Sequence, residues 1–469
     1  MSHRSEKLKV DDFEGNSKWG QLAWDLLETI FEVWTGEGQC SYRFTTLRLV
    51  NRHWKRLADK LVKKIRPAST NSMENVGLLL DTMHEIRKVD LSWRRFDNDQ
   101  AMGLARGLRS RESLIEVDMT GYDLPGITWL LEALGSCPNL ECINCGFYGQ
   151  ADSAIEMLSD VLKNHSSLTK LELSWGHQSN QSNLGAQYLM SAIEKTSAPL
   201  RVLKLSGVDL SSKCGEDLGE ALGSCKEQLQ VVDISDNRSL MCAGLTPAFR
   251  RLGGCSRLEK LNFENCSGGD ESIKTLANLI SEIPNLKELK MARNRIMTYG
   301  AHHICRIIES APNLTLLDIS VNPLGETGCE NLLESLGKNN GSLKTLICRF
   351  CYGMEEATKW NIGLGMSGLE ALVVGYDFIR RSGVASLGAG LAASGTLKSL
   401  KLSLPLARVF SVDLLSGVPS LKKLHLEVMG GVDCQFLVTL LETVDLEELS
   451  FEANTIEGGF FFFFFFFFF

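Results

Sequence analysis

The sequence lacks the features that would place the chain in a membrane, on nucleic acid or outside the cell. No apolar run approaches the roughly 20 residues that span a bilayer, and the polar residues 1–9 contain no apolar signal core. Lys and Arg number 49 against 57 Asp and Glu, so we expect no nucleic-acid partner. Proline is scarce, at 10 among 469 residues, and the composition excludes disordered and collagen-like classes. We therefore expect a soluble cytoplasmic or nuclear protein without a membrane partner.

One pattern recurs from residue 86 to residue 451, with apolar residues at positions 1, 4 and 6 of each copy, as in Leu168, Leu171 and Leu173. Fourteen copies follow one another at a mean spacing of about 28 residues. Their first residues are Ile86, Leu114, Leu140, Leu168, Leu200, Leu229, Leu258, Leu286, Leu314, Leu343, Leu369, Leu397, Leu421 and Leu446. Alternation at positions 4 and 6 predicts a short strand with one buried face. The helical spacing that follows, as at Ile304 and Ile308, predicts one helix per copy.

Position 9 of several copies carries a polar or thiol side chain. These residues are Asn237, Cys266, Asn294, Asn322, Cys351 and Asn454. The whole pattern resembles the leucine-rich repeat, and its period resembles the ribonuclease-inhibitor-like subclass. The resemblance implies an α/β solenoid with parallel strands on the concave side and helices on the convex side. A buried Asn is tolerated at position 9 because it can bond the turning backbone of its neighbours.

Motifs that resemble catalytic or metal sites do not fit this register. Gly363-x-Gly365-x-x-Gly368 matches a dinucleotide fingerprint, but it precedes a predicted strand instead of following one. Cys142-x-x-Cys145 and Cys348-x-x-Cys351 have zinc-site spacing, yet they lie seven repeats apart. In the first pair, Cys145 points into the core and Cys142 points away from it. No nucleophile elbow, P-loop or paired-His motif is present, so we expect reduced core thiols, no metal, no cofactor and no enzymatic activity.

Residues 19–66 depart from the repeat and show two helical stripes of apolar residues. They resemble an F-box in Asp25-Leu26-Leu27, in Ile30-Phe31, in Val50-x-Arg52-x-Trp54 and in Leu57-Ala58, with Ala23 where the family has Pro. The stretch from Phe31 to Val50 is also several residues longer than in the family. The resemblance implies docking on the S-phase-kinase-associated adaptor of a cullin complex through eight residues. These are Leu22, Leu26, Leu27, Ile30, Phe31, Val50, Trp54 and Leu57. The alternative is a plain helical cap over the first repeat.

An F-box ahead of leucine-rich repeats implies a substrate-recognition subunit of a cullin-based ubiquitin ligase, which binds the adaptor and its target with different parts of the chain. The alternative is a repeat scaffold or inhibitor that binds a protein without any ligase. A GTPase-activating role, which resembles that of the Ran GTPase-activating proteins, is the third hypothesis. Outside its complex, the chain is expected to be a monomer.

The variable strand positions predict a protein-binding face. Large aromatic side chains follow the strands and acidic side chains lie between the buried apolar positions, so a partner with a basic patch would be attracted there. The candidate partner-binding residues are Trp93, Tyr122, Phe147, Trp175, Asp90, Asp118, Glu172, Phe350 and Tyr376. The alternative is that half of these aromatic residues pack against the next repeat and that the charges are an ordinary solvated surface.

The domain prediction has five parts. They are a disordered segment 1–18, an F-box-like module 19–66, a linker or cap 67–85, the repeats 86–459 and a poly-Phe tail 460–469. Ten consecutive Phe residues are what a translated thymine tract produces, so we interpret the tail as a gene-model artefact.

Overall fold

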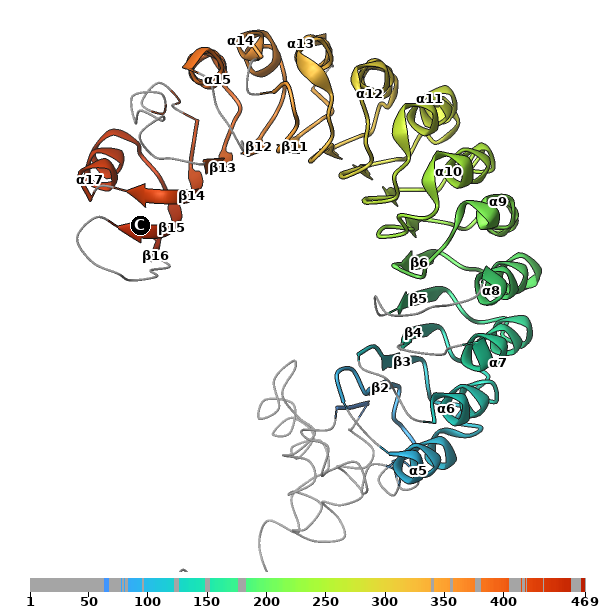
Figure 1. Cartoon of the computed structure of the whole chain (residues 1–469). Coiled ribbons are helices and arrows are strands. Elements are labelled where there is room, and N and C mark those ends of the chain that lie inside the picture. Colours follow the sequence, from blue (N-terminus) through green and yellow to red (C-terminus); the bar gives the residue numbers. More distant parts are fainter. Residues whose placement is uncertain are drawn as a thin grey trace, which may run out of the picture. The chain divides into compact units, whose positions relative to one another are not determined.

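The computed structural model describes the repeats and a short segment before them (Figure 1). The described residues are 63–66, 77, 80, 83–94, 97–121, 126–147, 152–175, 183–338, 341–354, 357–375, 381–404, 415, 418, 420–432, 434–456 and 465–468. The chain divides into two compact units, unit 1 at residues 1–200 and unit 2 at residues 201–469.

Unit 1 is a parallel sheet with helices between its strands. The strands, in spatial and chain order, are β1 (Lys64–Ile65), β2 (Lys88–Asp90), β3 (Glu116–Met119), β4 (Cys142–Phe147) and β5 (Lys170–Trp175). The helices are α5 (Asn98–Leu108), α6 (Ile127–Leu134), α7 (Asp152–Asn164) and α8 (Asn183–Lys195). Helix α5 begins with a capping box, in which Asp97 accepts the Gln100 backbone N–H at 2.8 Å.

Unit 2 repeats the same alternation. Its strands are β6 (Val202–Ser206), β7 (Val231–Asp233), β8 (Lys260–Asn262), β9 (Glu288–Lys290), β10 (Leu316–Asp318), β11 (Thr345–Arg349), β12 (Ala371–Gly375), β13 (Ser399–Leu404), β14 (Lys423–Val432), β15 (Glu448–Ile456) and β16 (Phe465–Phe468). Its α-helices are α9 (Gly215–Ser224), α10 (Met241–Arg250), α11 (Gly269–Leu279), α12 (Thr298–Ser310), α13 (Gly325–Lys338), α14 (Trp360–Gly365), α15 (Arg381–Ala393) and α17 (Cys434–Thr443). Two short 3-10 helices, η4 (Ser212–Cys214) and η5 (Ile280–Glu282), flank α9 and α11. Strands β6 to β15 are parallel, and none of the helices described in either unit is long and apolar enough to cross a membrane.

Each of the fourteen predicted repeats contributes one strand, from β2 to β15, so the predicted strand–helix alternation is confirmed. In unit 2, the apolar residue at position 4 lies in register with its counterpart in the next repeat. This row is Leu203, Val232, Leu261, Leu289, Leu317, Leu346, Leu372, Leu400, Leu424 and Leu449, each at most 2% exposed. Burial of one such side chain contributes about 1.5–3 kcal/mol, so stacking of successive repeats builds the core.

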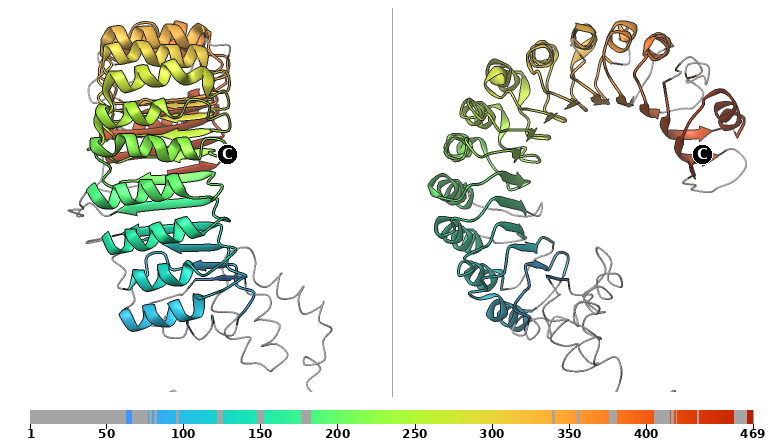
Figure 2. Two further views of the ribbon diagram at one scale, coloured as in Figure 1. Left: turned by 90° about the vertical axis from the view of Figure 1, so that its right-hand side faces the viewer. Right: turned by 180° about the vertical axis from the view of Figure 1, so that it is seen from behind.

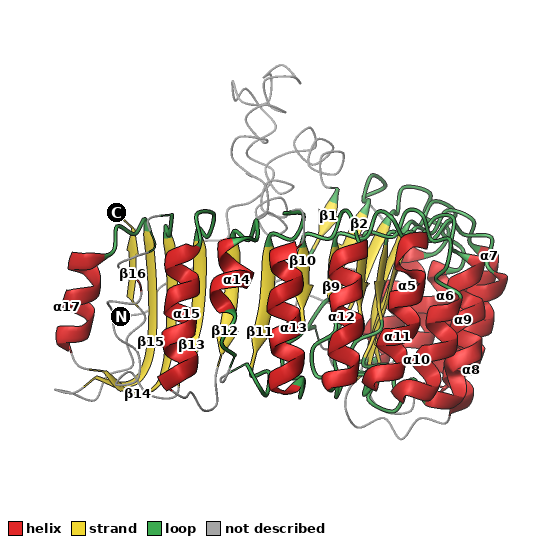
Figure 3. Ribbon diagram, turned by 90° about the horizontal axis from the view of Figure 1, so that it is seen from above, coloured by secondary structure: helices red, strands yellow, loops and turns green. Residues whose placement is uncertain are grey.

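In each unit the described helices lie along one side of the strands (Figure 1, Figure 2). Figure 3 shows the helices α12, α13, α14 and α15 of unit 2 side by side against their sheet. We call the opposite side of the strands the open face. Its side chains occupy repeat positions 3, 5 and 7, because alternate strand residues point to opposite sides of a sheet.

Buried position-9 side chains join neighbouring repeats, as predicted. Asn294 donates to the carbonyls of Phe263 and Ala292 at 2.8 and 3.1 Å, and its Oδ1 accepts the N–H groups of Cys266 and Gly268. Where cysteine replaces asparagine the donation persists, since the Cys266 thiol donates to a carbonyl one repeat earlier at 3.0 Å. These bonds satisfy backbone groups that the sharp turn after each strand leaves without a ladder partner.

Ile65, expected at the end of a helical stripe, does not lie in a helix. Lys64 and Ile65 instead form β1, which pairs parallel with β2, and the Lys63 carbonyl accepts the N–H groups of Arg87 and Lys88 at 2.8 and 2.9 Å. The physical reason is that β1 satisfies the edge of β2 and buries Ile65, which is 4% exposed.

At the other end, Phe465–Phe468 pairs antiparallel with β15, and Phe468 lies opposite Glu448. The interpretation of the tail as an artefact concerns the gene and stays a prediction.

Candidate protein-binding surface

The open face of unit 1 carries a row of polar side chains at position 5. Strand register places Asp90 beside Asp118, Asp118 beside Asn144, and Asn144 beside Glu172. Three predicted partner-binding acids therefore lie in one row on four adjoining strands. Neighbouring strands are about 4.8 Å apart, so the row presents its charge to a partner as one strip.

Two of these acids also hold the turns that follow their strands. Asp90 Oδ1 accepts the backbone N–H and the hydroxyl of Ser92 at 3.2 and 2.6 Å. Asp118 Oδ1 accepts the same two groups of Thr120 at 3.0 and 2.7 Å. Asp233 repeats the arrangement in unit 2. One carboxylate oxygen thus supports the chain's own turn, and the second is directed to other groups.

Asp90 is paired within the chain. Its Oδ2 lies 3.5 Å from both Lys64 Nζ and Arg66 Nε. Burial raises the pKa of Asp90, but the Ser92 hydrogen bonds and the charges of Arg66 and Lys64 outweigh burial, so the pKa lies below its ordinary value. A partner would have to compete with these cations at Asp90, whereas Asp118 has no ion pair among the described residues.

The rest of the row is held by one neutral and one charged neighbour. Asn144 Nδ2 lies 3.5 Å from Asp118 Oδ2, and Lys170 Nζ lies 3.2 Å from Glu172 Oε1. Cys142, expected to point away from the core, shares the open face with Asn144 but is only 8% exposed. Burial raises its pKa to about 12, so it is a neutral thiol at physiological pH.

The predicted aromatic residues have different surroundings. Trp93 is 57% exposed just beyond β2, at a φ of 57° that side-chain-bearing residues rarely adopt. Phe147 and Trp175 end β4 and β5 and lie opposite each other in register. Tyr122 and Tyr376 lie outside the described residues. Of these five aromatic residues, Trp93 is therefore the one that the structure shows to be exposed.

In unit 2, a polar network crosses the open face at position 7. Arg349 Nη2 donates to Ser403 Oγ at 2.8 Å and to Glu427 Oε2 at 2.6 Å, and Ser403 Oγ donates to Glu427 Oε2 at 2.8 Å. Gly375 lies between them in register, where a Cβ would come within 3.3–3.4 Å of the Arg349 and Ser403 Cβ atoms and the Phe350 ring. Phe350 thus packs against the next repeat, as the alternative hypothesis for the aromatic residues proposed.

Sequence reasoning missed this network. The residues come from β11, β13 and β14, up to 78 positions apart, but all share repeat position 7. The shared repeat position of Arg349, Ser403 and Glu427 is the feature of the sequence that indicates their proximity.

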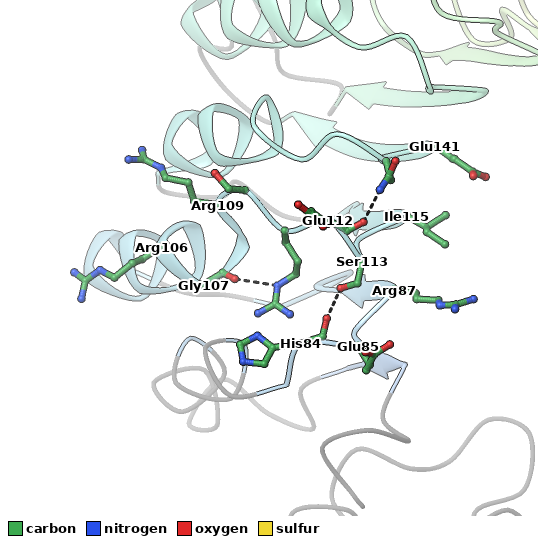
Figure 4. Close-up of a pocket in the computed structure, with 13 residues that line it drawn as sticks. His84, Glu85, Arg87, Arg106, Gly107, Arg109, Glu112, Ser113, Ile115 and Glu141 are labelled. Atoms are coloured by element: carbon green, nitrogen blue, oxygen red, sulfur yellow. Dashed lines mark hydrogen bonds between the residues drawn. The ribbon is translucent and has the colours of Figure 1, made fainter. Parts of the chain in front are cut away.

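A groove of about 870 Å³ lies in unit 1, where helix ends lead into β2, β3 and β4 (Figure 4). It is lined by His84, Glu85, Arg87, Arg106, Gly107, Arg109, Ser110, Arg111, Glu112, Ser113, Ile115, Asn139 and Glu141. Arg111 is only 9% exposed, and its Nε donates to the Gly107 carbonyl at 3.1 Å. Its Nη1 and Nη2 donate to the carbonyls of Met83 and Leu80. The buried guanidinium is thus occupied by backbone, and the exposed lining mixes both charge signs.

The cysteine pairs are structural. Cys145 and Cys348 are fully buried, and burial raises the pKa of both thiols. Cys351 occupies position 9 and donates to the Ile319 carbonyl at 3.2 Å. In the part of the chain that the structure describes, no three His, Cys, Asp or Glu side chains are grouped to hold a metal.

Comparison with known proteins agrees with the repeat architecture. No family model matches the chain. The mouse ribonuclease inhibitor is 25% identical over 300 residues, which cover 60% of this chain and 63% of that protein. The pig ribonuclease inhibitor is 25% identical over 312 residues, 58% of this chain and 66% of that protein. This chain carries leucine-rich repeats of the ribonuclease-inhibitor-like type.

Other similar proteins carry the same repeats beside further domains. The human NACHT, LRR and PYD domains-containing protein 12 is 26% identical over 255 residues, 45% of this chain and 23% of that protein. The ribonuclease-inhibitor-like chain spans just under two thirds of the length of the two ribonuclease inhibitors. The predicted adaptor-binding residues, Leu22 to Leu57, lie outside the described residues, so their docking stays a prediction.

Proposed function

We propose that this chain is a non-catalytic scaffold that holds a protein partner on the open face of its repeats. The observation that supports this proposal most directly is the open face itself, where charged side chains lie in register on successive strands and the described helices lie on the other side. Its similarity to ribonuclease inhibitors supports the same role. The described cysteines are free, and all but Cys242 are buried, which suits the reducing cytoplasm or nucleus.

Ribonuclease A, a basic protein, is the first probe for this function. We expect the full-length chain to bind it, and Asp118→Lys with Glu172→Lys to weaken binding at least about tenfold, because the acidic row would then repel a basic surface. Calorimetric titration at two salt concentrations measures the dissociation constant, and the loss should shrink at high salt.

Glu156→Lys with Glu194→Lys is the matched control, since both glutamates are exposed on helices of the same unit. Equal losses in the two double variants would contradict a binding role for the open face. No binding by the folded wild-type chain would exclude ribonuclease A as a partner.

A second candidate function is that of a ubiquitin-ligase receptor, favoured by the F-box-like residues Asp25 to Phe31 and Val50 to Ala58. We infer that this segment docks on the S-phase-kinase-associated adaptor by burying its apolar stripe. The purified adaptor should then bind the full-length chain at micromolar or lower concentration. Leu26→Asp should abolish binding, because a charge cannot be buried unpaired in a helix-on-helix contact. Ser17→Asp, outside the stripe, should leave binding unchanged.

Failure of the wild-type chain to bind the adaptor would leave the scaffold function intact and remove the ligase role.

A further inference from the structure

The open face of unit 2 becomes more apolar over three adjoining strands. Strands β8 and β9 carry charges at position 3, where Lys260 and Glu288 pair at 2.6 Å. Beside Asp318 on β10 and Thr345 on β11, aliphatic side chains occupy the other four places at positions 3 and 5 of β10 to β12 and stay partly exposed. They are Leu316, Ile347, Ala371 and Val373. Charges return on β13 at Lys401. Apolar side chains left on a charged, uncovered face indicate a contact area.

Cationic donors without acceptors adjoin these aliphatic side chains. Among the described residues, none accepts the buried Nε–H of Arg349, although its Nη2 serves Ser403 and Glu427. Lys401 lies beside Val373 in register, and no described carboxylate is within ion-pair distance of its Nζ. A buried donor without an acceptor is costly, so the Arg349 guanidinium favours an incoming acceptor, and the partly exposed Lys401 adds a second positive charge beside it.

We propose that the surface formed by Leu316, Ile347, Val373, Arg349 and Lys401 binds an extended segment of a partner protein in which branched aliphatic side chains flank a Glu or Asp. This inference rests on the scaffold function proposed above and names the chemistry of a partner for unit 2. The aliphatic side chains of the segment pack on Ile347 and Val373, and its carboxylate accepts from Lys401 Nζ beside the Arg349 guanidinium.

Three features favour a carboxylate over other groups. The acids beside this surface already serve the chain, because Glu427 is bonded to Arg349 and Ser403, and Asp318 Oδ1 accepts the Ser320 N–H. A neutral amide accepts less strongly than a carboxylate from a cationic donor. Gly375 contributes no side chain between Arg349 and Ser403, so backbone and side chains of the segment can approach the strands closely.

The test uses fluorescein-labelled octapeptide pools and the full-length chain. One pool has a central Glu flanked by Val, Ile and Leu in mixture, and the matched pool has Gln at the centre. Fluorescence anisotropy should show binding of the Glu pool at least about tenfold tighter than that of the Gln pool. Lys401→Met and Arg349→Met should each reduce Glu-pool binding about tenfold.

Lys290→Met is the matched control, because Lys290 occupies the same repeat position as Lys401 but lies on β9. Lys401→Met also breaks no ion pair among the described residues, so it leaves the hydrogen bonds of Arg349 to Ser403 and Glu427 in place. Equal binding of the two pools, or equal effects of Lys401→Met and Lys290→Met, would overturn the inference.

Ribonuclease A binding, measured on the same preparation, separates this inference from the scaffold function. If ribonuclease A binds through unit 1 and the Glu pool does not bind, the scaffold function stands and the proposed surface is wrong. If neither ligand binds the folded chain, both proposals fail.

Discussion

Replacing Asn322 by leucine is expected to lower the free energy of unfolding of unit 2 by about 3–5 kcal/mol. Asn322 is 1% exposed, and its Nδ2 donates to the carbonyls of Met291, Ile319 and Ser320 at 3.0, 2.8 and 3.2 Å. Its Oδ1 accepts the N–H groups of two further residues at 2.9 and 3.1 Å. Leucine fills a similar volume but leaves these five backbone groups without the side chain that bonds them. Each buried polar group so orphaned costs about 1–3 kcal/mol before the turn relaxes.

Position 9 carries asparagine in some repeats and cysteine in others, so cysteine at position 322 is the control substitution. Asn322→Cys should cost only about 1–2 kcal/mol, because a thiol keeps one donation to a carbonyl. Cys351 makes that bond one repeat later, to Ile319 at 3.2 Å. Urea unfolding of the full chain, followed by far-ultraviolet circular dichroism, measures both variants. Hydrogen exchange of β9 to β11 should accelerate in Asn322→Leu. If leucine and cysteine cost the same, the bonds to Asn322 do not stabilise the repeat as we infer.

The repeat register predicted most of the fold because it is redundant. Fourteen copies repeat one spacing, so an error in any one copy cannot shift the others. The same register placed Cys145 and Cys348 in the core and Asn294 and Asn322 at buried turns, and the structure confirms all four. Local spacing is sufficient for these features because the partners of each residue lie in its own repeat or in the adjoining one.

The open face was predicted less completely, because its contacts depend on which side chains stand beside each other across strands. Asp-x-Ser or Asp-x-Thr occurs at Asp90, Asp118, Asp233 and Asp318, and in each case the carboxylate holds its own turn. Reading these acids only as partner contacts missed that local role. The bond from Arg349 to Glu427 crosses two strands, and only alignment of repeat positions would have found it.

Strand β1 shows a different limit. Apolar spacing from Leu47 to Ile65 fits a helix, and nothing local marks its end. The free edge of β2, which is a feature of the folded array, selects the strand for Lys64 and Ile65. Tertiary pairing thus overrides local periodicity where a segment meets an open sheet edge.

Arg111→Met is expected to lower the stability of unit 1 by about 3–5 kcal/mol, because it removes a buried cation that serves three carbonyls. The guanidinium fixes Leu80 and Met83, which precede the first repeat, to Gly107 on α5. Methionine fills the space of the aliphatic stem and leaves those carbonyls unbonded. The segment before β2 should then detach from the array, and limited proteolysis of the full chain should cleave it faster near Met83.

Two further variants separate the role of the fork-shaped guanidinium from that of the charge. Arg111→Lys keeps the charge but cannot reach three carbonyls with the planar geometry of arginine, so we expect an intermediate loss of about 1–3 kcal/mol. Arg106→Met removes an exposed arginine from the same helix and should change neither stability nor cleavage. If Arg111→Met cleaved no faster than Arg106→Met, the segment before β2 would be held by apolar packing of residues such as Leu80, which is fully buried. If cleavage is fastest in Arg111→Met, slower in Arg111→Lys and slowest in the wild type, the hydrogen bonds of Arg111 hold the segment.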